Sequence, residues 1–375
     1  MILFVLLFLV SLYFIYNLVF QLFWEKGLFI SLHFSEKETY EGQRIRFREA
    51  IVNHKFLPLP FMQLSFRLHK SLRFENEKLE SVSDYNYIHD IFSLSFFQKE
   101  EKTFTITCGK RGIYSLDLLR ISTRNLLMPT VMRAEFPVNH TIVVFPKPIP
   151  SRKLEIFWQS FFGQVTSKKT DTEDAFSFRG IREYEATDPI RKINWKATAK
   201  TGELMVNTFF SAEARQIVLL LDLSRLRERH WEILAEESIR IAAALAKRFI
   251  HRSFSVQLIS NGDDKEGNPC FSSSSSVGGM TEKVIGYGLA KIDLSEREPC
   301  ELPVFLQERF RPSRDRKEIY VLISPNYTPE NLVLFRKLCT GQSGIWVEIV
   351  DAEKIRESGE ASVVEKGRVQ WSVET

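Results

Sequence analysis

The sequence predicts a multidomain protein with an N-terminal transmembrane helix, a β-sandwich and a doubly wound α/β domain. Three observations predict this fold class. Residues 1–24 contain no charged side chain. Residues 27–148 alternate apolar and polar side chains, and residues 215–352 alternate short apolar runs with helical patterns. A charged segment, 151–214, lies between the two domains, and residues 353–375 are expected to form a C-terminal tail.

Composition and charge fit folded domains and disfavour two classes of protein. The 51 basic and 47 acidic residues give a net charge of only +4, too balanced to predict nucleic-acid binding. The four cysteines, Cys108, Cys270, Cys300 and Cys339, lie far apart without C-x-x-C spacing. Neither a structural zinc site nor a disulfide framework is therefore predicted.

The first 24 residues are long enough, as one helix, to cross the roughly 30 Å hydrocarbon layer of a bilayer. A cleaved signal peptide is the alternative, but no basic region precedes the apolar run and no small-x-small cleavage site follows it. Basic side chains follow the helix and none precedes it, which places the folded domains in the cytoplasm. We therefore expect a single-pass protein of the cell membrane. The basic residues are Lys26, Lys37, Arg44, Arg46 and Arg48.

The β-domain is predicted from strands of period two. Met62, Leu64, Phe66 and Leu68 alternate with polar residues, as a strand buried on one face requires. Several short strands separated by Gly, Pro and Asn predict a β-sandwich of immunoglobulin-like type over 27–148. Further strands are expected over 44–52, 103–108, 114–121 and 141–145.

The third part is predicted from alternating strands and helices. The run from Ile217 to Leu221 is apolar at every position, which is typical of a parallel strand covered on both faces. Repeated β-α-β order then predicts an open, mostly parallel, doubly wound sheet. The later strands are expected over 254–259, 318–324 and 345–350, and the helices over 228–251, 282–291, 304–310 and 329–339.

A candidate metal site follows the first strand of this domain, at Asp222 and Ser224. These two residues resemble the start of the D-x-S-x-S pattern with which von Willebrand factor A domains hold a divalent ion. The third position is Leu226, which offers no oxygen, and Asn326 follows the later strand where such domains often carry an acid. Two interpretations stay open: a degenerate Mg²⁺ site, or side chains that cap the next helix or settle the loop. We expect no other cofactor.

The charged segment contains a run of alternating charges between Arg182 and Lys200. Asp188 precedes a proline, which favours a turn. An arginine beside Trp195 allows stacking on the indole as well as hydrogen bonds to a carboxylate. We therefore expect a network of paired charges around Tyr184 and Trp195. Its members are Arg182, Glu183, Glu185, Asp188, Arg191, Lys196 and Lys200.

This run resembles the signature of domain-of-unknown-function family fifty-eight, roughly R-E-Y-x-x-G-D-x-x-R-x-I-x-W-x-x-x-A-R. The order of membrane segment, β-rich domain, signature and von Willebrand factor A-like domain is similar too. The chain departs from the family at Thr187, where glycine is usual, and by having one clear membrane span where many relatives carry two. The matching residues are Arg182, Glu183, Tyr184, Asp188, Arg191, Ile193, Trp195 and Ala199, with Lys200 in place of the last arginine.

The resemblance implies an adaptor that accompanies a MoxR-type AAA+ ATPase in the assembly or maturation of membrane or envelope complexes. The signature is then either a structural latch, which fastens the charged segment to the α/β domain, or an interaction surface for the ATPase or its client. The expected partners are that ATPase and the bilayer. The candidate interaction residues are Arg182, Glu183, Tyr184, Asp188, Arg191, Asn194, Trp195 and Lys200.

Two other functions remain as alternatives. A metal-dependent or phosphate-handling enzyme would be centred on Asp188 and Arg191, or on Asp222. The sequence has no P-loop, nucleophile elbow or H-E-x-x-H helix, so we expect no catalytic residues and no small-molecule substrate. A structural envelope protein is the second alternative, and it predicts the opposite orientation in the membrane.

Overall fold

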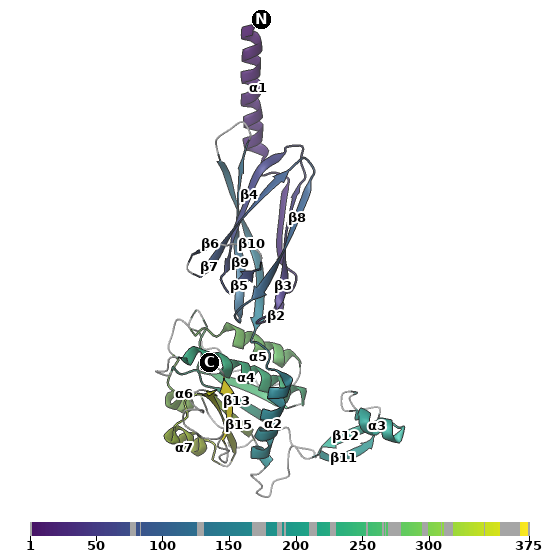
Figure 1. Ribbon diagram of the computed structural model, residues 1–375, viewed down its shortest axis with the longest axis vertical. Helices are drawn as coiled ribbons and strands as arrows, with labels where there is room; N and C mark the ends of the chain where they lie inside the picture. Colours follow the sequence, from purple (N-terminus) through teal and green to yellow (C-terminus); the bar gives the residue numbers. More distant parts are fainter. Residues whose placement is uncertain are drawn as a thin grey trace. The chain divides into compact units, whose positions relative to one another are not determined.

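The computed structural model divides the chain into two compact units, Met1–Pro148 and Ile149–Thr375 (Figure 1). Each unit has its own hydrophobic core. The structure describes residues 2–75, 80–82, 84–125, 131–166, 178–185, 190, 193–209, 216–225, 230–252, 254–264, 266, 268, 279–294, 299–308, 310, 318–340, 342–352 and 368–373.

The first unit begins with helix α1 (Ile2–Phe23), where a transmembrane helix is predicted. Within the described part of the chain, it is the helix long and apolar enough to cross a membrane. The side chains of residues 2–15 are exposed, whereas Asn17 and Phe20 in its last two turns are buried. Length and composition thus agree with a membrane anchor, and the cytoplasmic orientation stays a prediction.

Two sheets form the β-sandwich of the first unit. Their strands are β1 (Leu28–Phe34), β2 (Glu38–Tyr40), β3 (Arg44–Asn53), β4 (Leu59–His69), β5 (Leu72–Phe74), β6 (Glu80–Val82), β7 (Tyr85–Leu94), β8 (Lys99–Cys108), β9 (Gly112–Arg124) and β10 (Val131–Phe145). One sheet has the order β1-β3-β8-β5 and the other β2-β10-β9-β4-β7-β6. Neighbours are antiparallel except β2, which runs parallel to β10. The predicted β-sandwich is confirmed.

The alternating side chains of the strands fill the space between the two sheets. In β4, Met62, Leu64, Phe66 and Leu68 are all buried, and most of the residues between them are only partly buried. Phe66 meets Phe47 of the other sheet, with 5.4 Å between the ring centroids. The period of two predicted the buried face correctly because each sheet has one face on this core.

The second unit is built on a five-stranded parallel sheet with the order β14-β13-β15-β16-β17. The strands are β13 (Gln216–Leu221), β14 (Ser255–Ser260), β15 (Glu318–Ser324), β16 (Ser343–Asp351) and β17 (Arg368–Val373). The helices are α2 (Ser151–Thr166), α4 (Trp231–His251), α5 (Gly279–Lys291), α6 (Leu302–Glu308) and α7 (Pro329–Leu338).

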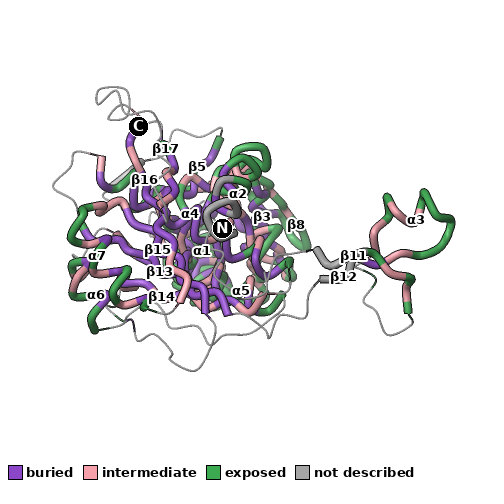
Figure 2. The backbone as a smooth tube through the Cα atoms, turned by 90° about the horizontal axis from the view of Figure 1, so that it is seen from below, coloured by how far each residue is buried: buried purple, intermediate pink, exposed green. Residues whose placement is uncertain are grey.

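Helices cover both faces of this sheet, as a doubly wound fold requires (Figure 2). Ile217, Leu219 and Leu221 of β13 belong to the apolar cluster that also contains residues of α2, α4 and α5. Val218 and Leu220 belong to a second cluster, with residues of α6 and α7. Every side chain of β13 is therefore buried, which explains why its sequence shows no polar alternation.

The boundaries of the α/β unit differ from the predicted 215–352. Helix α2 lies inside the predicted charged segment 151–214, yet it buries Phe157, Trp158 and Phe161 in the core of the sheet. Strand β17 lies inside the predicted tail 353–375 and pairs with β16 as the edge strand. Both elements bury only some of their side chains, and they bury them against parts of the chain that are distant in sequence.

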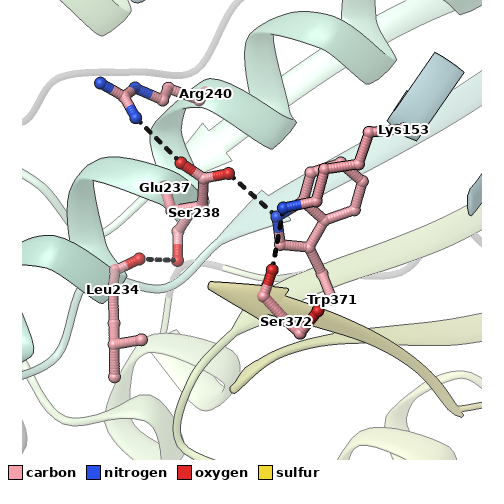
Figure 3. A network of polar contacts seen from close by, with 7 residues as sticks. All are labelled: Lys153, Leu234, Glu237, Ser238, Arg240, Trp371 and Ser372. Atoms are coloured by element: carbon pink, nitrogen blue, oxygen red, sulfur yellow. Dashed lines mark hydrogen bonds and ion pairs between the residues drawn. The ribbon is translucent and has the colours of Figure 1, made fainter. Parts of the chain in front are cut away.

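Polar contacts hold β17 against two helices (Figure 3). The indole Nε1 of Trp371 donates to Oε1 of Glu237 on α4 at 2.9 Å, and Arg240 donates to the other oxygen of Glu237 at 3.1 Å. Lys153 of α2 donates to the carbonyl of Ser372 at 2.9 Å, and its Nζ lies 4.3 Å from the Trp371 ring centroid. The edge strand is thus fixed by both an apolar ring and charge-assisted hydrogen bonds.

We predict that Trp371→Ala lowers the free energy of unfolding of the α/β unit by about 3–5 kcal/mol, because it removes a buried ring and one donor to Glu237. Trp371→Phe keeps the apolar ring and should cost only about 1–3 kcal/mol. Chemical denaturation of the detergent-solubilised chain measures both. Val333→Ala, at an exposed position of α7, is the control. Equal stability of Trp371→Ala and the wild type would contradict the assigned role of β17.

Candidate functional site

The first candidate site lies where three neighbouring parallel strands end. Asp222 follows β13, Asn261 follows β14, and Ser324 is the last residue of β15. Leu221 is level with Ser260 on one side and with Ile323 on the other. This register brings the polar residues after each strand to one edge of the sheet, where open α/β folds place their ligands.

The carboxylate of Asp222 is fully buried and accepts hydrogen bonds on both oxygens. Its Oδ1 accepts from the backbone N–H of Ser224 at 3.0 Å, from the Ser224 hydroxyl, and from Nδ2 of Asn261 at 2.9 Å. Its Oδ2 accepts from the hydroxyl of Ser324 at 2.6 Å and from Nδ2 of Asn326 at 2.9 Å. We call these five residues the Asp222 cluster.

Contacts with the backbone fix the direction of the donors in the Asp222 cluster. The Oδ1 of Asn261 accepts from the N–H of Leu223 at 2.8 Å, so its amide nitrogen must face Asp222. The same nitrogen and the hydroxyl of Ser224 also lie at 2.9 and 3.0 Å from the carbonyl of Cys300. The cluster therefore presents N–H and O–H groups, not lone pairs, to the carboxylate.

This arrangement does not fit the predicted divalent metal site at Asp222 and Ser224. A hard cation needs several oxygen lone pairs, whereas the lone pairs of Asp222 are directed at protein donors. The donor set matches a closed structural cluster that joins three strand ends.

Of the two roles that the non-metal interpretation allowed, settling the loop agrees with the contacts. Asp222 and Ser224 settle the loop after β13 through the Ser224 N–H, as one of the two interpretations expected. They do not cap the next helix, because α4 begins at Trp231 with His230 at its N-cap position. Asn261 was missed by sequence reasoning. Its only signal is its place directly after a neighbouring parallel strand.

The second candidate site is the signature segment, which forms a small unit with a separate two-stranded sheet. Strand β11 (Phe178–Glu183) pairs antiparallel with β12 (Met205–Phe209), and helix α3 (Trp195–Thr201) lies between them in sequence. Asn194 is the N-cap of α3, because its Oδ1 accepts from the N–H of Ala197 at 3.0 Å. Gly202 ends the helix with a φ of 83°, a conformation that favours glycine.

Backbone contacts close this β11–α3–β12 unit around Val206, which is buried. Ile193 forms a bridge with Val206, and the N–H of Asn194 donates to the carbonyl of Met205 at 2.7 Å. The hydroxyl of Thr198 accepts from the N–H of Met205 at 3.0 Å. The conformation of the unit is thus set by caps and backbone bonds.

Only part of the predicted network around Tyr184 and Trp195 lies within the described residues. Trp195 is the first residue of α3, and its side chain is 64% exposed. Arg182 lies 3.5 Å from Glu185 and also donates to the carbonyl of Glu183 at 2.9 Å. The side chain of Lys200 is exposed. The predicted members Asp188 and Arg191 lie outside the described residues, and packing of this unit on the α/β sheet stays a prediction.

Two large apolar side chains of the unit face solvent. Ile190 is 70% exposed and Trp195 is 64% exposed, and both lie within the signature. Ile181 and Leu204 are exposed to a smaller extent, at 41% and 44%. Sequence reasoning singled out Trp195 but expected it inside the charge network, and it missed Ile190. We call these four residues the apolar surface of the signature unit.

The segment from residue 180 to residue 368 matches the model of a protein family described as "Protein of unknown function DUF58". The chain belongs to this family. The match begins within β11 and ends at the first residue of β17, so it covers the signature unit and most of the DUF58 α/β sheet. The β-sandwich and α1 lie outside the matched segment.

Solved structures similar to this DUF58 protein share little sequence with it. The CARDB domain of the PF1109 protein from Pyrococcus furiosus is 14% identical, with 31% of this chain and 92% of that chain covered and a TM-score of 0.19. A non-cellulosomal cohesin from Archaeoglobus fulgidus is 11% identical, with 34% and 96% covered and a TM-score of 0.21. At these TM-scores the likenesses carry no argument about function. No curated protein matches the chain.

We predict that Asp222→Ala lowers the free energy of unfolding by about 3 kcal/mol or more, because it leaves several buried donors without an acceptor. Asp264→Ala is the matched control, since Asp264 also accepts loop hydrogen bonds but lies outside the core. Thermal unfolding with Mg²⁺ and with a chelator completes the test. We expect the same midpoint in both, and a midpoint raised by Mg²⁺ would restore the metal site.

Proposed function

We propose that this protein is a membrane-anchored, non-catalytic adaptor that binds a protein partner through its signature unit. The exposure of Trp195 carries this proposal. The unit keeps its conformation through Asn194, Thr198, Gly202 and Val206, so the indole is not needed to fold it. A large exposed aromatic side chain, in a unit that exposes a second large apolar residue, is typical of a binding hot spot.

The exposed charged side chains of the signature unit have both signs. Lys196 and Lys200 are exposed on α3, and Glu183, Glu185 and Glu203 are exposed in the same unit. Charges beside a binding surface select the orientation of the partner. We infer that the partner presents an apolar pocket with charges of both signs around it.

We propose an AAA+ ATPase of the MoxR type as that partner, acting with this protein in the assembly or maturation of membrane or envelope complexes. Membership of the DUF58 family supports the pairing, because the family resembles the companions of these ATPases. A von Willebrand factor A-like identity for the α/β unit is part of the same proposal. The sealed Asp222 cluster supports an adaptor rather than a metal-dependent enzyme, because the carboxylate is not open to a substrate.

The binding proposal predicts that Trp195→Ala weakens the partner complex by about 2 kcal/mol, roughly thirtyfold in Kd. The full chain in detergent is used to capture partners with and without ATP, and an AAA+ ATPase should be recovered in a nucleotide-sensitive manner. Val333→Ala is the matched control, because Val333 is also 64% exposed but lies on α7. Circular dichroism checks that both variants fold.

Two results would count against the adaptor proposal. Recovery of no AAA+ ATPase in either nucleotide condition would remove the proposed partner. Equal recovery with Trp195→Ala and with the wild type would remove the signature unit as the binding surface. Consumption of a small molecule that depends on Asp188 would favour the enzyme alternative instead.

The cytoplasmic orientation is tested separately by a reporter fused after Thr375. Because several basic residues follow α1, we expect a cytoplasmic reporter to be active and a periplasmic or extracellular reporter to be silent. The reverse pattern would support the structural envelope protein. It would also exclude a cytoplasmic ATPase as the direct partner.

A further inference from the structure

The β-sandwich has one end that adjoins α1. Register places the loops 54–58 and 95–98 at this end, because Leu28 is level with Asn53, and Leu59 is level with Leu94. The hydrogen bond from the N–H of Phe97 to the carbonyl of Lys55, 3.3 Å long, joins the two loops. Both loops therefore lie where the chain leaves α1 and enters β1 (Figure 1).

Several contacts fix this end of the sandwich to the last two turns of α1. Phe20 and Trp24 are buried in the core of the sandwich. Nδ2 of Asn125, the residue after β9, donates to Oδ1 of Asn17 at 2.8 Å. Lys55 donates to the carbonyls of Trp24 and Lys26, the latter at 2.8 Å. Burial lowers the pKa of Lys55 to about 8, against the opposing charge of Glu25.

The position of these contacts along α1 sets their depth in a bilayer. The 22 residues of α1 span about 33 Å, close to the roughly 30 Å hydrocarbon thickness. Asn17 lies six residues before Phe23, the last residue of α1, or about 9 Å along the helix. If α1 spans the membrane, the sandwich residues that contact Asn17 and Phe20 must lie within the boundary layer of the bilayer.

The loops 54–58 and 95–98, joined to Trp24 and Lys26 at the end of α1, carry exposed aromatic rings. Phe56 is 80% exposed, Phe96 59% and Phe97 56%. Phe56 packs edge-on against Phe97, with centroids 4.8 Å apart, and lies 6.3 Å from Phe96. We call these three residues the aromatic loop cluster. In water such a cluster exposes apolar area without compensation.

The backbone of the cluster adds a second, independent observation. Phe97 has a φ of 53°, which is unfavourable for a bulky side chain and is accepted more readily by glycine or asparagine. The strained conformation keeps an aromatic residue at the tip of a loop where a small polar residue would suit the backbone better. Strain retained at one exposed position points to a function for that side chain.

We propose that the aromatic loop cluster inserts into the interfacial layer of the bilayer that α1 spans, so that the sandwich is held against the membrane at two points. The occupant of this surface is lipid. The proposal rests on α1 acting as a membrane anchor, which is part of the proposed function. Apolar and aromatic side chains partition favourably into this layer. Because the helix already holds the domain at the membrane, insertion of the loops does not lose the entropy of bringing the domain there again.

The test uses the full chain in lipid vesicles, with Cys270 and Cys300 replaced by serine. An environment-sensitive fluorophore is attached at Phe96→Cys or, as the control, at Lys110→Cys, which is exposed beyond the other end of strand β8. We expect the fluorescence emission of the label at Phe96→Cys to shift to shorter wavelength. Lipids that carry a nitroxide near the headgroup should quench this label severalfold more than the label at Lys110→Cys. Resistance to alkaline extraction reports the anchor independently.

A second variant separates insertion from folding. Phe56→Ser combined with Phe97→Gly should reduce the quenching of the label at Phe96→Cys without lowering the unfolding temperature, because glycine accepts the positive φ at position 97. If the chain resists extraction but both labels report water, the insertion proposal fails and the anchor stands. If the label is shielded only in native membranes that contain other proteins, the cluster binds protein and the proposal also fails. If alkali extracts the chain from the vesicles, both the membrane anchor and the insertion proposal fail.

Discussion

The burial of β13 on both faces is the constraint on which the α/β unit depends. The five side chains from Ile217 to Leu221 lie in apolar clusters, so the polar groups at the carboxyl end of this strand begin beyond Leu221. Asp222 is the first of these, and its buried charge has to be matched by donors from the neighbouring strand ends. Asn261, Ser324 and Asn326 supply them, and the edge that binds ligands in many α/β folds is closed by side chains here.

In contrast to this closed edge, the signature unit exposes large apolar side chains. Its fold is maintained by Asn194, Gly202 and backbone contacts around Val206, none of which needs the exposed indole of Trp195. Residues that hold the unit together and residues that face solvent are therefore different. This separation allows substitution of Trp195 to report on binding without a large change in folding.

A similar separation exists in the first unit. Asn17 and Phe20, in the last turns of α1, and Trp24, directly after it, join the helix to the sandwich. The remaining apolar surface of the helix and the aromatic loop cluster are left for a different environment. A bilayer would satisfy both, since the length of α1 is close to the thickness of the hydrocarbon layer and the proposed insertion places the loops at its boundary.

The sequence alone determined the elements whose pattern is set by local burial: α1, the alternating strand β4, and the largely apolar, fully buried strands β13 and β15. It did not determine α2 or β17, because Trp158 and Trp371 acquire their role only by contact with α4 and the sheet, far away in sequence. Nor did it determine the exposure of Trp195. A tryptophan among charges is compatible with a buried network and with a free surface, and only the tertiary arrangement decides which groups lie within reach of its ring.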